Sequence, residues 1–153
     1  MQARDASFDF EAFFEAHYQR IARAVARVVG DPARAEEVTV EAFWKLWRTP
    51  GAHGERAGGW VYRTAMRLGL NELRSRRRRG QYESQAEGAT ALPNPEQAHA
   101  AEQERMQVRT ALAALEGRQA EMLLLRHGGM SYEEVAAALG LNPASVGTLL
   151  ARG

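Results

Sequence analysis

Cysteine is absent from the 153-residue chain. Without it the chain can form no disulfide, thiol nucleophile or cysteine-ligated zinc site, and this composition suits a reducing compartment. No apolar run approaches the roughly 18 residues that a membrane span requires. The N-terminus carries acidic residues and lacks the apolar core of a secretory signal. We therefore expect a cytoplasmic protein without direct membrane insertion.

Catalytic and metal-binding patterns are also lacking. The four histidines are scattered, and none is followed by a second histidine at helical spacing. The chain has no glycine-rich phosphate loop and no nucleophile elbow. The glutamate pairs at 36–37 and 133–134 are typical of solvated helix faces. We expect no enzyme activity, no metal site and no cofactor.

The charge is distributed unevenly along the chain. Hydrophobic residues make up 45% of the sequence, enough for packed cores, and the length allows one or two domains. Residues 1–80 hold 15 Lys and Arg against 10 Asp and Glu, whereas residues 81–153 hold 5 against 9. Neutralising phosphates supplies most non-specific affinity for DNA. On charge alone, the N-terminal half is the better candidate for binding nucleic acid.

Hydrophobic periodicity predicts an all-α fold of two small helical domains joined by a flexible linker. The first domain is expected at residues 1–79 and the second, with four short helices, at 98–153. Residues 80–97 are polar, contain Gly and Pro, and show no period, as flexible linkers do. A glycine-containing loop is expected at 49–59. The three helices of the first domain are expected at about residues 9–29, 32–48 and 60–79.

The second predicted helix carries apolar residues on two opposite sides. One side is a normal core stripe, made of Ala35, Val38, Thr39, Ala42, Phe43 and Leu46. The opposite side carries Glu37, Val40, Glu41, Trp44 and Arg48. Trp is enriched at the centres of protein interfaces, so a Trp and a Val rimmed by carboxylates favour a protein-binding surface. The alternative is that a neighbouring helix covers Trp44.

The third predicted helix carries a basic row. Arg63, Arg67 and Arg74 fall within about 40° of one another by the helical period, and Trp60 and Asn71 flank them. The row continues into Arg76, Arg77, Arg78 and Arg79. An arginine run can be a solvated helix end that suits the helix dipole. Four consecutive arginines repel one another, however, and favour a polyanion. Together with an aromatic and an amide, they favour phosphate contacts and stacking on unpaired bases.

The C-terminal stretch has the form of a helix-turn-helix. Ser131 and Glu134 form a capping box, and Gly140 can end the helix that they begin. Asn142 and Pro143 then start a second helix. Two short helices joined by such a turn are typical of the DNA-binding motif. An ordinary αα-hairpin in a core is the alternative.

Three segments resemble parts of bacterial RNA polymerase sigma factors of the extracytoplasmic-function group, and they come in the family's order. Ala35 to Arg48 resembles the helix that binds core polymerase, and Gly58 to Arg79 resembles the promoter-melting segment. Ala111 to Arg152 is similar to region 4 of these factors. The resemblance implies a transcription initiation factor that binds core RNA polymerase and promoter DNA. It also implies an anti-sigma factor as a partner.

The same resemblance implies three sets of contact residues. The polymerase-binding set is Glu37, Val40, Glu41, Trp44 and Arg48. The second set contacts the minus-ten element, where flipped bases of the non-template strand are the expected ligand. Its members are Trp60, Arg63, Arg67, Asn71, Arg74, Arg76, Arg77, Arg78 and Arg79. The set for the minus-thirty-five element is Ser131, Tyr132, Asn142, Ser145, Thr148 and Arg152, with the last helix in the major groove.

The chain departs from the family pattern at several of these positions. Members usually carry Gln at Val40 and Leu at Trp44, and basic residues are common where Gly147 and Leu149 stand. Members also continue with a basic tail, so we expect region 4 to be truncated at Gly153. Two alternatives stay open. One is a sigma-like decoy that binds an anti-sigma factor without productive DNA recognition, and the other is an ordinary DNA-binding repressor.

Overall fold

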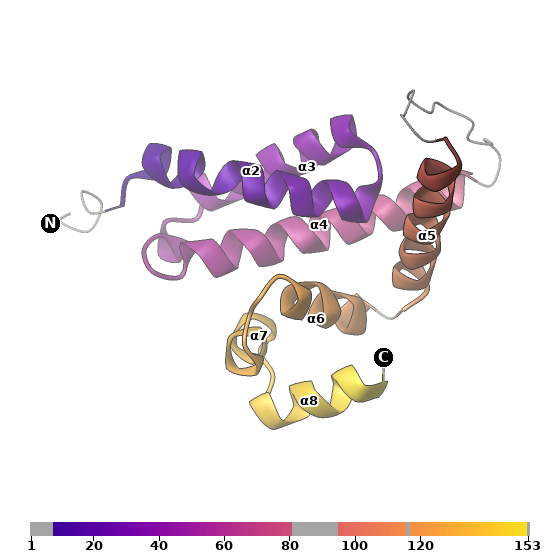
Figure 1. The fold of residues 1–153 in the computed structure, drawn as a ribbon. Coiled ribbons are helices and arrows are strands. Elements are labelled where there is room, and N and C mark those ends of the chain that lie inside the picture. Colours follow the sequence, from indigo (N-terminus) through magenta and orange to yellow (C-terminus); the bar gives the residue numbers. More distant parts are fainter. Residues whose placement is uncertain (1–7, 81–94, 116, 153) are drawn as a thin grey trace, which may run out of the picture.

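The structure is a computed structural model, and it describes residues 8–80, 95–115 and 117–152. The described residues form helices joined by turns and contain no strand (Figure 1). This confirms the predicted all-α fold. The α-helices are α2 (Phe10–Val29), α3 (Pro32–Trp47), α4 (Ala57–Gly80), α5 (Pro95–Ala114), α6 (Gly117–His127), α7 (Tyr132–Leu139) and α8 (Pro143–Arg152), and a short 3-10 helix, η1, spans Pro50–Ala52.

Helices α2, α3 and α4 form the N-terminal bundle, and local sequence signals set where they begin. The Asp9 carboxylate accepts a hydrogen bond from the backbone N–H of Ala12, 3.1 Å away. Asp31 caps α3 in the same way, 3.0 Å from the N–H of Ala33, directly before a proline at the first helical position. Between these helices Gly30 adopts a left-handed conformation with φ of +82°, which ends α2 and turns the chain.

The core side of α3 is buried as predicted. Ala35, Val38, Thr39, Ala42, Phe43 and Leu46 are all less than 4% exposed. Phe43 contacts the aromatic rings of Phe14 and Tyr18 on α2. The Thr39 hydroxyl donates to the Ala35 carbonyl at 2.7 Å, which satisfies a polar group inside the core.

Helix α4 begins earlier than the sequence suggests. We predicted a loop through residue 59, but the helix starts at Ala57 and includes two glycines in its first turn. Ala57 is fully buried, and the N–H of Trp60 donates to the Arg56 carbonyl at 3.0 Å. Burial of the first turn against the bundle therefore outweighs the low helix propensity of glycine.

The C-terminal unit consists of α5, α6, α7 and α8. Ser131 and Glu134 form the predicted capping box at the start of α7, and Gly140, with φ of +70°, ends that helix. The Asn142 side chain caps α8 by accepting from the N–H of Ala144 at 3.0 Å. The small core of the unit is Ala120, Met122, Leu125, Val135, Ala136 and Val146.

The two units lie directly against each other. Helices α6 and α7 pack under α4, and α5 stands across its C-terminal end (Figure 1). Most of the predicted linker at residues 80–97 lies outside the described residues, because the structure does not describe residues 81–94. At its edges Gly80 belongs to α4 and Pro95 begins α5.

Among the described residues, no single helix is long and apolar enough to cross a membrane. Only α7 and α8 taken together, with a bend of 100° between them, would pass by length and composition.

Candidate protein and nucleic-acid interfaces

The outer side of α3 presents an apolar surface to solvent. Val40 is 51% exposed and Trp44 is 53% exposed. The guanidinium of Arg48 lies over the Trp44 ring, 4.5 Å from its centroid. Within the part of the chain that the structure describes, no helix covers this face, so the alternative in which a neighbouring helix covers Trp44 is wrong. We call Glu37, Val40, Glu41, Trp44 and Arg48 the α3 outer face.

A surface hollow runs along this outer face and continues onto α2. It is lined by Tyr18 and Glu36 together with four of the residues above. Burial raises the pKa of the Tyr18 hydroxyl, with a further contribution from the charge of Glu36. Sequence periodicity did not single out Tyr18, because its position beside α3 depends on how α2 packs.

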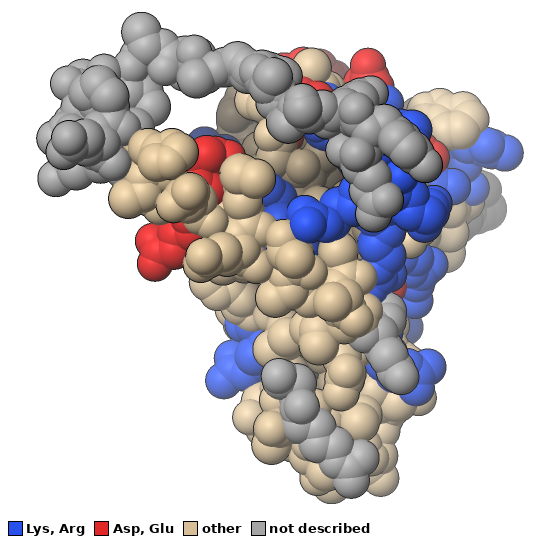
Figure 2. Space-filling view, turned by 90° about the vertical axis from the view of Figure 1, so that its right-hand side faces the viewer, with Lys and Arg blue, Asp and Glu red and all other residues tan. Residues whose placement is uncertain are grey.

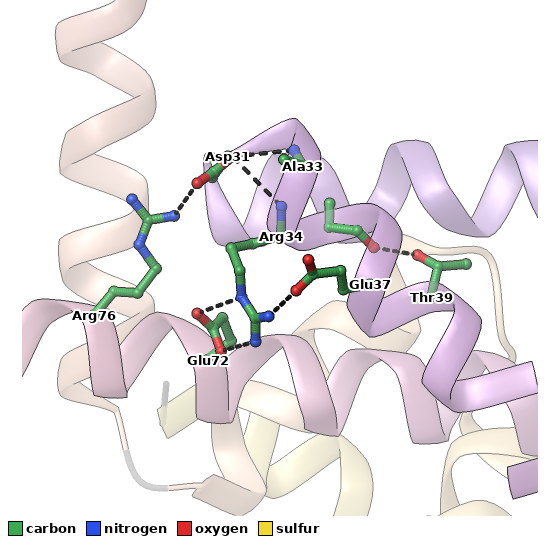
Figure 3. Close-up of polar contacts among 8 residues, drawn as sticks. Asp31, Ala33, Arg34, Glu37, Thr39, Glu72 and Arg76 are labelled. Atoms are coloured by element: carbon green, nitrogen blue, oxygen red, sulfur yellow. Dashed lines mark hydrogen bonds and ion pairs between the residues drawn. The ribbon is translucent and has the colours of Figure 1, made fainter. Parts of the chain in front are cut away.

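An ion-pair network ties the start of α3 to α4 (Figure 3). The Arg34 guanidinium donates two hydrogen bonds to the Glu72 carboxylate, at 3.0 and 2.7 Å, and also pairs with Glu37. The Arg34 hydrogen bond holds the pKa of Glu72 below its ordinary value, against the opposing effect of burial. Arg76 forms an ion pair with Asp31 at 3.2 Å. Glu37 and Arg76 therefore form ion pairs within the bundle, although both also lie at its surface.

The basic row of α4 lies against the C-terminal unit, with Arg67 exposed and Arg63 and Arg74 half-buried. Arg67 pairs with Glu121 on α6, with Nε 3.2 Å from the carboxylate oxygen. Arg74 donates to the backbone carbonyl of Leu115 at 2.9 Å. Arg63 is half-buried, and its buried Nε has no hydrogen-bond partner. Burial lowers the pKa of Arg63, with a smaller contribution from Arg67. We call Arg63, Arg67 and Arg74 the α4 arginine row.

The other residues predicted to contact the minus-ten element differ in their exposure. Asn71 is exposed, and Trp60 is half-buried against the bundle core. Arg77, Arg78 and Arg79 are exposed in the last turn of α4. Figure 2 faces the side of the molecule where α4 ends, and it shows basic side chains gathered in its upper half above a mostly uncharged lower part. This distribution matches the charge asymmetry of the sequence.

The helix-turn-helix presents few charges. Tyr132, Ser145 and Thr148 are exposed, whereas the side chains of Ser131 and Asn142 act as helix caps. The side chain of Arg152 lies outside the described residues.

Gly147 stands where the family often has a basic residue, and its surroundings give a reason for its small size. A Cβ at this position would lie 3.3 Å from the ring of Tyr132, tighter than most such contacts. The Tyr132 ring is itself covered by the Arg126 guanidinium at 5.1 Å from its centroid. A side chain at position 147 would therefore require the exposed Tyr132 ring to shift by a few tenths of an ångström.

The structure reveals a contact that sequence reasoning missed. The Tyr62 hydroxyl donates to the Leu124 carbonyl at 3.4 Å, across the junction of the two units. A Cβ on Gly128 would lie 2.2 Å from that hydroxyl oxygen. A cleft of about 650 Å³ borders this junction, lined by Trp60 and Arg63 on one side and Met130 and Glu134 on the other. No local signal could have paired residues 62 and 128, since they belong to separate units.

Comparison with known proteins identifies the family that the chain resembles. Residues 13–79 match the family described as sigma-70 region 2, and residues 105–153 match sigma-70 region 4. The chain is 28% identical over 146 residues to the ECF RNA polymerase sigma factor SigK of Mycobacterium sp. (strain KMS), covering 90% of this chain and 75% of the relative. It is 31% identical over 147 residues to SigE of Mycolicibacterium smegmatis, covering 90% and 55%. It is 27% identical over 140 residues to SigL of Mycobacterium tuberculosis (strain ATCC 35801 / TMC 107 / Erdman), covering 88% and 78%. With both sigma-70 regions in order on an all-α fold, the chain belongs to the RNA polymerase sigma factors of the extracytoplasmic-function type, which direct transcription initiation.

Proposed function

We propose that the chain divides its work between two surfaces, with the α3 outer face binding core RNA polymerase and α4 binding the minus-ten element. The observation that carries the first assignment is the exposure of Trp44 and Val40 on an otherwise well-packed helix. A large apolar patch rimmed by charge is typical of a protein interface. This face lies away from the C-terminal unit, so polymerase can reach it in the conformation described above.

The assignment of α4 to DNA rests on its charge and its neighbours. The arginine row and Arg77–Arg79 supply cations for phosphates, and Trp60 and Asn71 supply a stacking surface and an amide. Residues 1–79 then act as the region 2 unit and residues 98–153 as the region 4 unit. We assign the minus-thirty-five element to the exposed residues Tyr132, Ser145 and Thr148, with Ser131, Asn142 and Arg152.

This role requires binding and no catalysis by the chain itself, and it places the protein in the cytoplasm with the chromosome and polymerase. We also propose an anti-sigma factor as a regulatory partner. Support for that partner comes from the resemblance to the extracytoplasmic-function group.

A transcription assay tests the proposal. Core RNA polymerase, the chain and sheared genomic DNA are combined, and the 5′ ends of the transcripts are mapped. We expect discrete start sites that need the chain and share upstream elements. Core polymerase alone serves as the control. Identical start-site profiles with and without the chain would contradict the proposal.

The decoy alternative has one observation in its favour, which is the near absence of charge on α8 before Arg152. A decoy would leave the start-site profile of core polymerase unchanged, and so would a simple repressor. The same experiment therefore separates an initiation factor from both alternatives.

A further inference from the structure

A second group of basic side chains lies on α2, outside the surfaces assigned above. Residues 16–29 of this helix contain three arginines and no aspartate or glutamate. Arg20, Arg23 and Arg27 are all exposed, and none forms an ion pair within the part of the chain that the structure describes. Their spacings of three and four residues bring like charges together, which destabilises a helix. The group therefore suits a negatively charged partner.

Two of these three arginines project from nearly the same side of α2. Arg20 and Arg27 are seven residues apart and so differ by only about 20° around the helix axis. They lie about 40° and 60° from the buried Ala24, whereas Arg23 lies about 100° from it. We call Arg20 and Arg27 the α2 arginine pair. Arg23 is turned further from the core, so it offers a comparison on the same helix.

The α2 arginine pair lies beside the first half of α4. The two helices run side by side in the same direction (Figure 1), and a Cβ on Gly69 would lie 3.7 Å from the side chain of Val25. The Arg20 guanidinium lies 6.0 Å from the centroid of the Tyr62 ring. Burial raises the pKa of the Tyr62 hydroxyl, and the positive charges of Arg20 and Arg27 oppose that rise. Both cations are therefore close to α4.

The cleft of about 650 Å³ connects this pair with the residues assigned to the minus-ten element. Arg20 and Trp60 both line it. Its charged lining residues are Arg20, Arg56, Arg63, Glu55 and Glu134, and the Glu134 carboxylate accepts from the N–H of Ser131 at 2.8 Å. A cationic track beside an aromatic ring is how proteins hold an unpaired strand. The position of Arg20 near Trp60 therefore favours a single strand over a duplex.

Helix electrostatics explain only one member of the pair. Arg27 lies in the last turn of α2, where a cation complements the helix dipole. Arg20 lies in the middle of the helix, where that effect has fallen off. Arg109 of α5 donates to the Arg27 backbone carbonyl at 3.2 Å, and Arg27 itself remains exposed. Both members of the pair can therefore reach a phosphate.

We propose that Arg20 and Arg27 form a second phosphate-binding track, which holds the backbone of the unpaired promoter strand while α4 contacts its bases. Phosphate contacts of this kind fix the position of a strand and add affinity without reading sequence. The inference rests on the proposed function, because it extends the DNA-binding surface of α4 onto α2.

The test compares double variants that change the charge of the pair or keep it. Arg20→Gln with Arg27→Gln removes both charges, and Arg20→Lys with Arg27→Lys keeps them. The matched control, Arg23→Gln with Arg118→Gln, makes the same change in net charge at exposed positions outside the pair. Circular dichroism checks that each variant keeps the helical content of the parent.

The readout is the salt dependence of DNA affinity, measured on the complex of each full-length chain with core polymerase. The probe is a labelled single strand of about 20 nucleotides and mixed sequence. Each phosphate contact contributes about 0.7 to the slope of log affinity against log salt, so the glutamine variant should lose about 1.4. That loss corresponds to about 25-fold weaker binding at 0.1 M salt. The control and the lysine variant should keep the slope of the parent.

The outcomes separate this inference from the proposed function. Equal slopes for the glutamine variant and its control would overturn the track, and so would a lysine variant that loses as much as the glutamine variant. A loss seen with a duplex of equal length but not with the single strand would overturn the assignment to the unpaired strand. If the glutamine double variant loses helical content, the single variants are measured, with an expected loss of about 0.7 each. Failure of the parent to redirect start sites would overturn the proposed function, whatever the slopes are.

Discussion

Individual side chains account for most of the proposed function of this chain, and Trp44 is the clearest example. It is 53% exposed in the last turn of a helix whose other side is packed in the core. Arg48 covers part of its ring, so the indole is partly restrained before any partner binds. A pre-positioned aromatic loses little conformational entropy on binding, which makes it an effective anchor.

We predict that Trp44→Ala weakens binding to core polymerase by about 30-fold, equivalent to about 2 kcal/mol. Because the side chain is exposed, the free energy of unfolding should change by less than about 0.5 kcal/mol. Fluorescence titration of labelled chain with core polymerase measures the first quantity, and urea unfolding measures the second. Met106→Ala, another exposed apolar residue, is the control. Core binding by Trp44→Ala as tight as the parent's would refute the interface.

Glu72 provides a pH-dependent link between α3 and α4. Its hydrogen bonds from Arg34 hold the pKa of Glu72 below the ordinary value of 4.5 in the folded state. A carboxyl group with a lowered folded pKa stabilises the fold above its unfolded pKa, and that contribution is lost as pH falls through the folded pKa. The contribution should therefore be complete at neutral pH and should decline below about pH 4.5.

We predict that Glu72→Gln destabilises the chain by about 1 kcal/mol at pH 7, a value kept small because Arg34 is partly exposed. The difference from the parent should shrink as the pH is lowered from 5 to 3. Urea unfolding at a series of pH values measures it. Glu15→Gln, which removes an exposed carboxylate of α2, should show neither effect. A stability difference that is independent of pH would show that the charge of Glu72 is unimportant.

At the scale of elements, α4 serves two purposes along its length. Its first two-thirds form the central helix of the bundle core, with Val61, Met66 and Leu70 at most 1% exposed. Its last turn carries Arg77, Arg78 and Arg79 beyond the packed region. The helix is thus anchored in the core along most of its length and strongly basic at its exposed end, the part that we propose contacts DNA.

We predict that replacing Arg77–Arg79 by serine makes DNA binding less dependent on salt. Each single-strand phosphate neutralised contributes a slope of about 0.7 in log affinity against log salt, so the loss should be about 2. The measurement is the affinity of the chain–core complex for a labelled single strand between about 0.05 and 0.2 M salt. The control removes three exposed arginines elsewhere, at Arg23, Arg105 and Arg118. Equal slopes for the two triple variants would contradict phosphate contact by the end of α4.

At the scale of the whole molecule, the arrangement joins two weak DNA-binding modules in one chain. The C-terminal unit has the helix-turn-helix but an acidic balance, and the N-terminal unit has the basic surface, with Arg67 and Arg74 of its arginine row paired to the C-terminal unit. Neither unit needs high affinity by itself if polymerase holds both on one promoter. Tethering replaces a second bimolecular step by an intramolecular one, with a high effective concentration.

We predict that the free chain binds duplex promoter DNA at least 100-fold more weakly than the chain–core complex does. Titration of a labelled promoter, taken from the mapped start sites, gives both affinities. An unrelated duplex of equal length measures the non-specific background. Tight, sequence-specific binding by the free chain would refute this dependence on polymerase.

The sequence by itself determined the helices, their caps and their two-sided patterns. Asp31–Pro32, Gly30 and the Ser131–Glu134 box act within a few residues, and the outer position of Trp44 follows from the helical period. Only the tertiary structure decided which residues contact the outer side of each helix. It left the face of Trp44 open, extended α4 back to a buried Ala57, and placed Glu121 against Arg67 and Gly128 against Tyr62. The reason is that contacts such as Tyr62 with Leu124 join residues far apart in the chain, and no local propensity or period records them.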